Sequence, residues 1–171
     1  MAIVRTYQGK TPELGEQVFL AENAAVIGDV IIGARSSVWY GVVARGDVHH
    51  IRIGSETSIQ DNSVLHVTGG LSPTLVGNRC TVGHGVTLHG CTVEDECLIG
   101  MGAILLDGAR VGRHCIVGAG ALVTPGTVIP EGHMALGAPA RVKRRLTDAE
   151  LAQIQSSADG YIELAKRYRA G

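Results

Sequence analysis

Aliphatic residues recur at every sixth position along most of this chain. From Leu20 the sequence divides into hexapeptides such as LAENAA, VIGDVI and IGARSS, and nearly every first position is Ile, Val, Leu or Ala. The fifth position is mostly small: Ala, Val, Ser, Thr or Cys. This pattern predicts one short strand and one turn per six residues, which is the repeat of the hexapeptide parallel β-helix.

Three such units close one triangular coil of about eighteen residues, and successive coils stack as parallel strands roughly 4.8 Å apart. We therefore predict an all-β solenoid, a left-handed parallel β-helix of hexapeptide repeats, because known hexapeptide coils wind left-handed in spite of the usual right-handed crossover. First positions should fill a thin aliphatic core, with the small fifth positions at the corners. The repeat is interrupted at 50–52 and around 69–75, and Gly-Gly and Ser-Pro in the second interruption predict a protruding loop.

The repeat ends after Pro139, so the chain divides into a β-helix domain, residues 1–140, and a C-terminal segment, residues 141–171. The basic run RVKRRL (141–146) is interpreted as a linker or a helix-packing segment. Thr147 and Glu150 follow in the spacing of a helix capping box. Apolar residues then recur at helical spacing, which predicts a C-terminal α-helix that packs on the solenoid.

Composition suits a fold with many tight turns and a narrow interior. Glycine accounts for 24 of 171 residues, well above the usual ~7%, and aromatic residues make up only 4%. The formal net charge of −1 gives no electrostatic basis for a nucleic-acid partner. No apolar run reaches the ~18 residues of a membrane span, and the N-terminus lacks a signal-peptide pattern. We expect a cytoplasmic protein with no nucleic acid and no membrane partner, whose cysteines are reduced.

Three histidines occupy informative positions of the repeat. His66 and His89 each follow the first position of the third strand, in successive coils, so their backbones should lie about 4.8 Å apart. Two rings at that spacing can share one zinc, because ligand nitrogens on a tetrahedral zinc stand roughly 3.3 Å apart. His84 is a third position of the preceding strand, above Asp61 of the coil below. It should emerge near a corner, turned away from the other two.

One chain alone is therefore not expected to bring all three histidines to one metal. A closed threefold assembly can do so, by joining the His84 corner of one subunit to the His66–His89 pair of the next. Three histidines with a fourth position open for water form the pattern of catalytic Zn²⁺ sites. Imidazole also suits Fe²⁺ and Co²⁺, so the residues leave the metal open.

Beyond the repeat, the sequence resembles the gamma-class carbonic anhydrases, in particular their cytoplasmic bacterial branch. The matching segments span nearly the whole chain: ARGD (44–47), IGSETSIQDNSVLH (53–66), VGHGVTLHG (82–90), LIGMGA (98–103) and VGAGALV (117–123). The resemblance implies a homotrimer with zinc between subunits, held by His66 and His89 of one chain and His84 of the next. It also implies the reaction, hydration of CO2 to bicarbonate.

The resemblance further implies roles for residues around the metal. Arg45 and Asp47 resemble a salt-bridged pair at the subunit interface, and Asp61 would join their network. Gln60 resembles the residue that orients water at the metal. Tyr161, in the segment GYIEL, is similar to a family tyrosine near the metal.

Three positions depart from the family pattern. Val48 and Thr68 stand where the glutamates of an acidic proton-shuttle loop would be expected, and Ser58 stands where the family has asparagine. This departure keeps other functions open, because a fold of this type does not by itself fix the chemistry. A hexapeptide acyltransferase would use one histidine and an acyl-CoA donor, and a thioesterase-like enzyme would act on a larger substrate at the same site. A non-catalytic trimeric scaffold would use zinc only to join its subunits.

Overall fold

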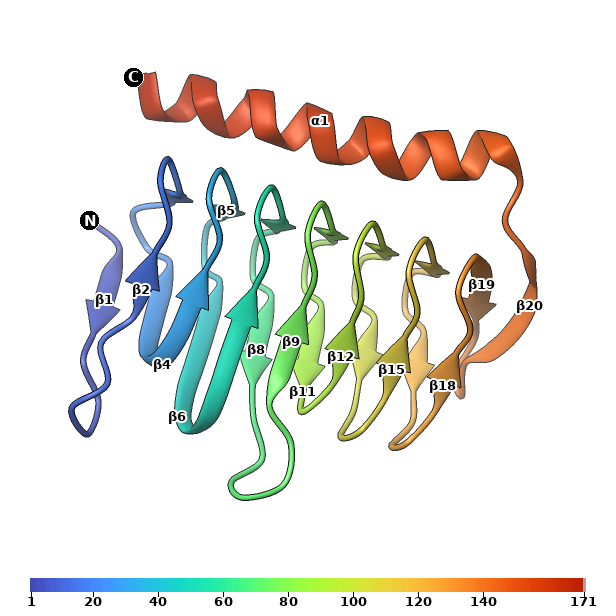
Figure 1. Ribbon diagram of the computed structural model, residues 1–171, viewed down its shortest axis with the longest axis horizontal. Helices are drawn as coiled ribbons and strands as arrows, with labels where there is room; N and C mark the ends of the chain where they lie inside the picture. Colours follow the sequence, from blue (N-terminus) through green and yellow to red (C-terminus); the bar gives the residue numbers. More distant parts are fainter. Residues whose placement is uncertain (171) are drawn as a thin grey trace.

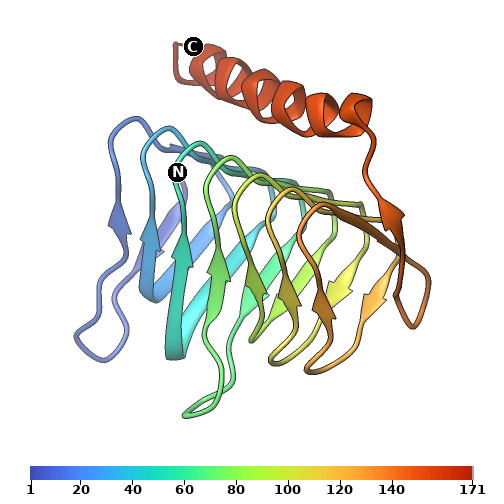
Figure 2. The same cartoon turned by 45° about the vertical axis from the view of Figure 1, so that its right-hand side comes forward.

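The computed structural model describes residues 1–170 of the 171-residue chain. It is a parallel β-solenoid followed by a single helix, α1 (Asp148–Ala170) (Figure 1). Successive coils stack along one axis, as the view in Figure 2 shows. The predicted parallel β-helix with a C-terminal α-helix is confirmed.

The strands form three faces, and on each face a strand pairs in parallel with the strand one coil away. Strands β4 (Ala25–Ile32) and β6 (Val43–Ile53) bend around a corner and therefore belong to two faces. The first face consists of β3 (Phe19–Leu20), β5 (Ser37–Val38), β7 (Ser58–Ile59), β10 (Thr81–Val82), β13 (Leu98–Ile99), β16 (Ile116–Val117) and β19 (His133–Leu136).

The second face is called the histidine face below, because His66 and His89 end two of its strands. It consists of β1 (Ile3–Arg5), the first parts of β4 and β6, and then β8 (Val64–His66), β11 (Thr87–His89), β14 (Ile104–Leu105) and β17 (Leu122–Val123). The third face consists of β2 (Glu13–Leu14), the last parts of β4 and β6, and then β9 (Thr74–Val76), β12 (Thr92–Val93), β15 (Arg110–Val111) and β18 (Val128–Ile129).

Aliphatic first positions fill the interior, as the repeat predicts. Residues from all coils are fully buried there, among them Ile32, Ile59, Leu65, Leu88 and Ile99. Burying one such side chain contributes roughly 1.5–3 kcal/mol, so this single column of aliphatic residues is the main source of stability. The predicted loop also forms, and residues between β8 and β9 protrude from the stack (Figure 1).

The cysteines are structural and unpaired. All four are buried and free, in agreement with the expected reduced state. Cys80, Cys97 and Cys115 lie in successive coils, and each thiol donates a hydrogen bond of 3.1 Å to a backbone carbonyl of the following coil. These small side chains thus fill a tight corner and also link one coil to the next.

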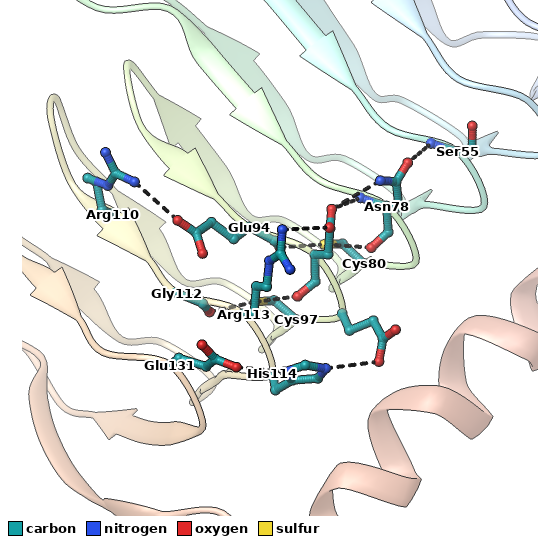
Figure 3. A network of polar contacts seen from close by, with 12 residues as sticks. Ser55, Asn78, Cys80, Glu94, Cys97, Arg110, Gly112, Arg113, His114 and Glu131 are labelled. Atoms are coloured by element: carbon teal, nitrogen blue, oxygen red, sulfur yellow. Dashed lines mark hydrogen bonds and ion pairs between the residues drawn. The ribbon is translucent and has the colours of Figure 1, made fainter.

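One corner of the solenoid places charged residues in the left-handed region of the backbone. Residues with φ between 53° and 59° are stacked there: Arg35, Glu56, Arg79, Glu96 and His114. This conformation costs a non-glycine residue on the order of 1–3 kcal/mol. Opposite charges alternate along the column: Arg79 lies 2.9 Å from Glu56. His114 approaches Glu131 at 3.4 Å at the far end (Figure 3).

Helix α1 runs back along the solenoid, so that both chain ends lie at the same end of the molecule (Figure 1). It contacts strands of the first face and buries Ile154, Ala158 and Ala165. Asp159 of the helix lies 2.8 Å from Arg79 of the charged corner. Among the described residues, no helix is both long and apolar enough to cross a membrane.

The segment interpreted as a linker forms a strand. Strand β20 (Arg141–Arg145) pairs antiparallel with β19, and its residues are exposed. Without this partner the last coil would present an unpaired strand edge, which natural sheets generally cover or charge. The basic run therefore closes the end of the solenoid and leads directly into α1.

The predicted capping box is formed at the start of α1. The backbone N–H of Thr147 donates to Glu150 Oε2 at 2.8 Å, and the backbone N–H of Glu150 donates to Thr147 Oγ1 at 3.3 Å. Arg144 donates to both carboxylate oxygens at 2.8 Å. The hydrogen-bonded Arg144 guanidinium, followed by the Thr147 N–H, lowers the pKa of Glu150 from 4.5 to about 2.

We predict that Glu150→Gln lowers the unfolding temperature at pH 7 and flattens its dependence on pH. The folded chain keeps Glu150 ionised to lower pH than the unfolded chain does. Its contribution is therefore complete above pH 4.5 and is lost as pH falls towards about 2. Thermal unfolding across this window measures the effect. Glu163→Gln, at an exposed helical position near Lys166, is the control; the same change in both variants would contradict the prediction.

Candidate metal centre

His66 and His89 face each other on adjacent strands of the histidine face. The parallel register of β8 and β11 places His66 opposite His89, as the repeat predicts. The Nδ1 atom of His66 lies 3.2 Å from the Nε2 atom of His89. Two imidazole nitrogens bound to one tetrahedral zinc at ~2.0–2.1 Å stand roughly 3.3 Å apart. The pair therefore has the separation that a shared metal requires.

An aspartate holds the opposite nitrogen of each ring. His66 Nε2 lies 3.0 Å from Asp47 Oδ1, and His89 Nδ1 lies 3.0 Å from Asp107 Oδ1. Histidines that bind metals almost always hydrogen-bond through their other ring nitrogen, often to a carboxylate. The nitrogens that face each other are thus the ones left for a metal, and the donor set fits Zn²⁺.

Asp47 is fixed from a second side by Arg45. The two side chains form an ion pair within the chain, and Arg45 occupies the position one coil before His66, since Ala44 pairs with Leu65. Burial acts to raise the pKa of Asp47, but the hydrogen bonds with His66 and Arg45 hold it below its usual value. Asp47 is therefore an ionised acceptor for His66 at neutral pH.

His84 belongs to a separate column at the neighbouring corner. The backbone N–H of Gly85 donates to the carbonyl of Asp61, and the N–H of Gly102 donates to the carbonyl of His84. His84 therefore stands directly above Asp61, as predicted, and its Nδ1 lies 2.9 Å from Asp61 Oδ2. Within the chain Asp61 thus pairs with His84, whereas Arg45 pairs with Asp47.

The single chain does not complete a three-residue metal site. Over residues 1–170, no three His, Cys, Asp or Glu side chains come together in an arrangement that could hold a metal ion. His84 has a half-exposed side chain whose Nδ1 is occupied by Asp61. The structure brings His66 and His89 together and leaves His84 apart, and both outcomes agree with the sequence prediction.

A groove of about 450 Å³ opens beside His84. It runs along the first face, over strands β10, β13 and β16. Its walls are mostly apolar and include Leu98, Met101 and Ile116. A groove of this kind can accept a small apolar molecule next to the imidazole of His84.

Gln60 and Tyr161 are the polar side chains predicted for the site that line this groove. Gln60 is 5% exposed and follows strand β7. Tyr161 comes from α1, where its ring packs edge-on against Trp39 with 5.9 Å between centroids. Burial, together with the nearby charge of Asp61, raises the pKa of Tyr161, so that its phenol stays protonated at neutral pH. Helix α1 therefore completes the wall that the solenoid leaves open.

Asp107 and Thr74 contribute to the centre but were not among the residues predicted from the sequence. Thr74 is fully buried; its hydroxyl donates to the carbonyl of His66 at 2.5 Å and accepts from the N–H of Gly90 at 2.9 Å. Thr74 thereby ties together the backbones of the two histidine strands. Asp107 stands one coil after Gly90, since the N–H of Gly108 donates to the Gly90 carbonyl, and the spacing of the repeat alone does not single it out.

Comparisons with known proteins identify relatives of this chain. The family described as Bacterial transferase hexapeptide (six repeats) matches residues 90–125. Gamma carbonic anhydrase 1, mitochondrial, of Arabidopsis thaliana is 52% identical over 94% of this chain, and the chain spans 60% of that relative's length. A carbonic anhydrase of Geobacillus kaustophilus is 41% identical, with 98% of this chain and 92% of the relative covered. A solved hexapeptide transferase family protein from Anaplasma phagocytophilum is 39% identical, with a TM-score of 0.93 over 97% of this chain and 98% of the other.

We predict that Thr74→Val lowers the free energy of unfolding by about 1–3 kcal/mol. The substitution keeps the shape of the side chain but removes the hydroxyl that donates to the His66 carbonyl and accepts from the Gly90 N–H, and it leaves these two groups only their direct hydrogen bond of 3.2 Å. Urea unfolding at matched protein concentration measures the loss. The control is Thr92→Val at a half-buried position of β12, with an expected change within ~0.5 kcal/mol. Equal stability of the two variants would refute the bridging role.

Proposed function

This chain belongs to the gamma carbonic anhydrase family of hexapeptide-repeat proteins, and from that premise we propose that it is a metal-dependent enzyme that hydrates CO2 to bicarbonate. The observation that carries the proposal is the His66–His89 pair, with facing nitrogens 3.2 Å apart and an aspartate behind each ring. The proposed metal is Zn²⁺, with Fe²⁺ or Co²⁺ as alternatives of similar ligand preference.

The proposed site lies between subunits of a homotrimer. His66 and His89 of one chain supply two nitrogens, and the half-exposed His84 of a second copy supplies the third. A closed threefold arrangement gives three equivalent sites from one repeated contact. The proposal needs the second copy because His84 stands at a different corner from the pair.

The histidine face has the character of a surface that another subunit covers. Beside the histidine pair runs a mostly apolar column of outward residues in successive coils: Val43, Val64, Thr87, Ile104 and Leu122. Val64 is 40% exposed and Ile104 is 39% exposed in the single chain. Burying such side chains is favourable by roughly 25 cal/mol per Å². The same contact that assembles the metal site would therefore also stabilise the trimer.

When bound, the metal supplies Lewis acidity that makes a water reactive near neutral pH. Asp47 and Asp107 keep the ring nitrogens of His66 and His89 directed towards it. Gln60, almost fully buried in the groove beside His84, presents an amide that can orient the reacting water. The apolar wall formed by Leu98 and Met101 receives CO2. Water and CO2 yield bicarbonate and one proton, and the proton leaves to buffer.

Acyl transfer is the second candidate, because a solved structure of similar fold is named as a hexapeptide transferase family protein. Acyltransferases of this fold require one histidine near an acyl-CoA donor. Here each of three histidines has its own carboxylate, at 2.9–3.0 Å. That arrangement favours metal binding. A thioesterase-like activity and a trimer with purely structural zinc remain alternative outcomes of the assays below.

We predict that purified protein contains about one Zn²⁺ or Fe²⁺ per chain and hydrates CO2. Metal content and stopped-flow CO2 hydration are measured on protein purified with and without oxygen. Because Val48 and Thr68 replace acidic residues, the rate should rise with the concentration of an added imidazole buffer that accepts the proton. A metal-loaded trimer without CO2 hydration would point to structural zinc, and activity only with acyl-CoA or a thioester would support the second candidate.

We further predict that mixed trimers of His84→Ala and His66→Ala subunits regain part of the activity and metal content that each variant lacks alone. In a mixed trimer, some interfaces combine an intact pair from one subunit with an intact His84 from the other. Trimers with both variants are isolated through two affinity tags. Mixing two differently tagged preparations of His84→Ala is the control. Absence of any rescue in verified mixed trimers would falsify the shared site.

A further inference from the structure

Asp107 and Thr68 form a polar pair directly behind His89. Neither residue belongs to the set that the family resemblance identifies, and Thr68 stands where a glutamate of the shuttle loop would be expected. We propose that Thr68 and Asp107 are positioning residues that hold His89 in the tautomer and orientation required for metal binding. The inference rests on the proposed function, in which His89 is a metal ligand.

The contacts join three separate parts of the chain. Asp107 Oδ1 lies 3.0 Å from His89 Nδ1. The Thr68 hydroxyl donates to the same carboxylate, at 2.9 Å from Oδ1 and 3.0 Å from Oδ2. Thr68 lies in the protruding loop after β8, His89 ends β11, and Asp107 follows β14. Because Thr68 contacts both oxygens, it fixes the rotation of the carboxylate as well as its position.

This geometry determines which nitrogen of His89 is free. An ionised carboxylate only accepts hydrogen bonds, so Nδ1 of His89 carries the proton and Nε2 keeps its lone pair. The Nε2 atom is the one that lies 3.2 Å from His66 Nδ1. Asp107 thus presents to the shared position the nitrogen that a metal can bind.

The backbone next to His89 leaves room for the carboxylate of Asp107. Gly90 follows His89 with φ at +60°, and a Cβ atom built on it would overlap Oδ1 of Asp107 and also approach Ser72 of the loop. The N–H of Gly108 donates to the Gly90 carbonyl at 2.7 Å, which holds the two coils together at this point. A side chain at position 90 would therefore displace Asp107 from His89.

Asp107 differs from the aspartate behind His66 in how it is held. Asp47 is bound by the Arg45 guanidinium, whereas Asp107 is bound by a neutral hydroxyl from the loop. The position of Asp107 therefore depends on whether the loop after β8 is in place. Thr68 therefore has a role through its hydroxyl, which holds Asp107 in place, although the family pattern has a glutamate at this position.

The test compares the Zn²⁺ affinity of the assembled trimer with that of its variants by competition with a chelator at fixed pH. Asp107→Asn should raise the Zn²⁺ dissociation constant by about 10–100-fold, which is the usual effect of losing such a carboxylate. Thr68→Val should raise it by a smaller factor, and Thr68→Ser, which keeps the hydroxyl, should restore the parent value. Asp95→Asn is the control, because Asp95 also accepts two hydrogen bonds, from Asn78 in the corner network of Figure 3.

The outcomes separate the inference from the proposed function. If the parent trimer binds Zn²⁺ and the Asp107→Asn variant binds it equally well, the positioning role is overturned and the proposed function is left intact. A parent trimer that binds neither Zn²⁺ nor Fe²⁺ overturns both. If Thr68→Ser is as weak a binder as Thr68→Val, the hydroxyl is not the group that acts. The unfolding midpoint of the metal-stripped protein should change no more in Asp107→Asn than in Asp95→Asn; a larger fall would indicate a purely structural role.

Discussion

Parallel pairing between successive coils is the constraint on which the rest of this structure depends. From β4 to β19, each strand pairs in parallel with the strand one coil earlier, so its side chains stand over particular residues roughly 4.8 Å away. Inward columns must be aliphatic, and outward columns are free to carry charge or imidazole. A shift of one residue would turn His66 inward and Leu65 outward. The pattern that fills the core is therefore the same pattern that brings His66 and His89 together.

This coupling explains how much could be predicted from the sequence. The pairing of His66 with His89, the stacking of His84 on Asp61 and the capping of α1 all depend on spacing that is visible in the repeat or within one turn. Asp107 was not predictable in this way, because its contact with His89 depends on a side-chain conformation and on a loop that folds back from outside the repeat. Strand β20 was missed because its basic residues are exposed, and only the open edge of β19 makes them a strand.

The shape of the solenoid also limits what one chain can do chemically. Its three faces meet at convex corners, so side chains on neighbouring faces diverge as they leave the backbone. Two ligand nitrogens can converge within one face, as His66 Nδ1 and His89 Nε2 do at 3.2 Å. The side chain of His84, at the corner, cannot turn back to meet them. A metal with three imidazole ligands on such a scaffold is therefore best built from two chains. In the proposed trimer, the groove beside His84 would form part of the interface, with Gln60 and Tyr161 in its wall.

The corners themselves support this assignment. Every corner needs residues with positive φ, but the corners meet the need differently. Under α1 the column consists of charged residues such as Arg79 and Glu96, whose side chains reach the helix or their neighbours. Beside His84 the column contains Asn62 and then Gly85, Gly102 and Gly120, and a Cβ atom on any of these three glycines would meet nothing within 4 Å. Glycine adopts positive φ there without strain, is not required by crowding within the chain, and leaves this part of the corner without side chains. A second subunit can approach such a corner closely enough for His84 to reach across, which a column of long charged side chains would prevent.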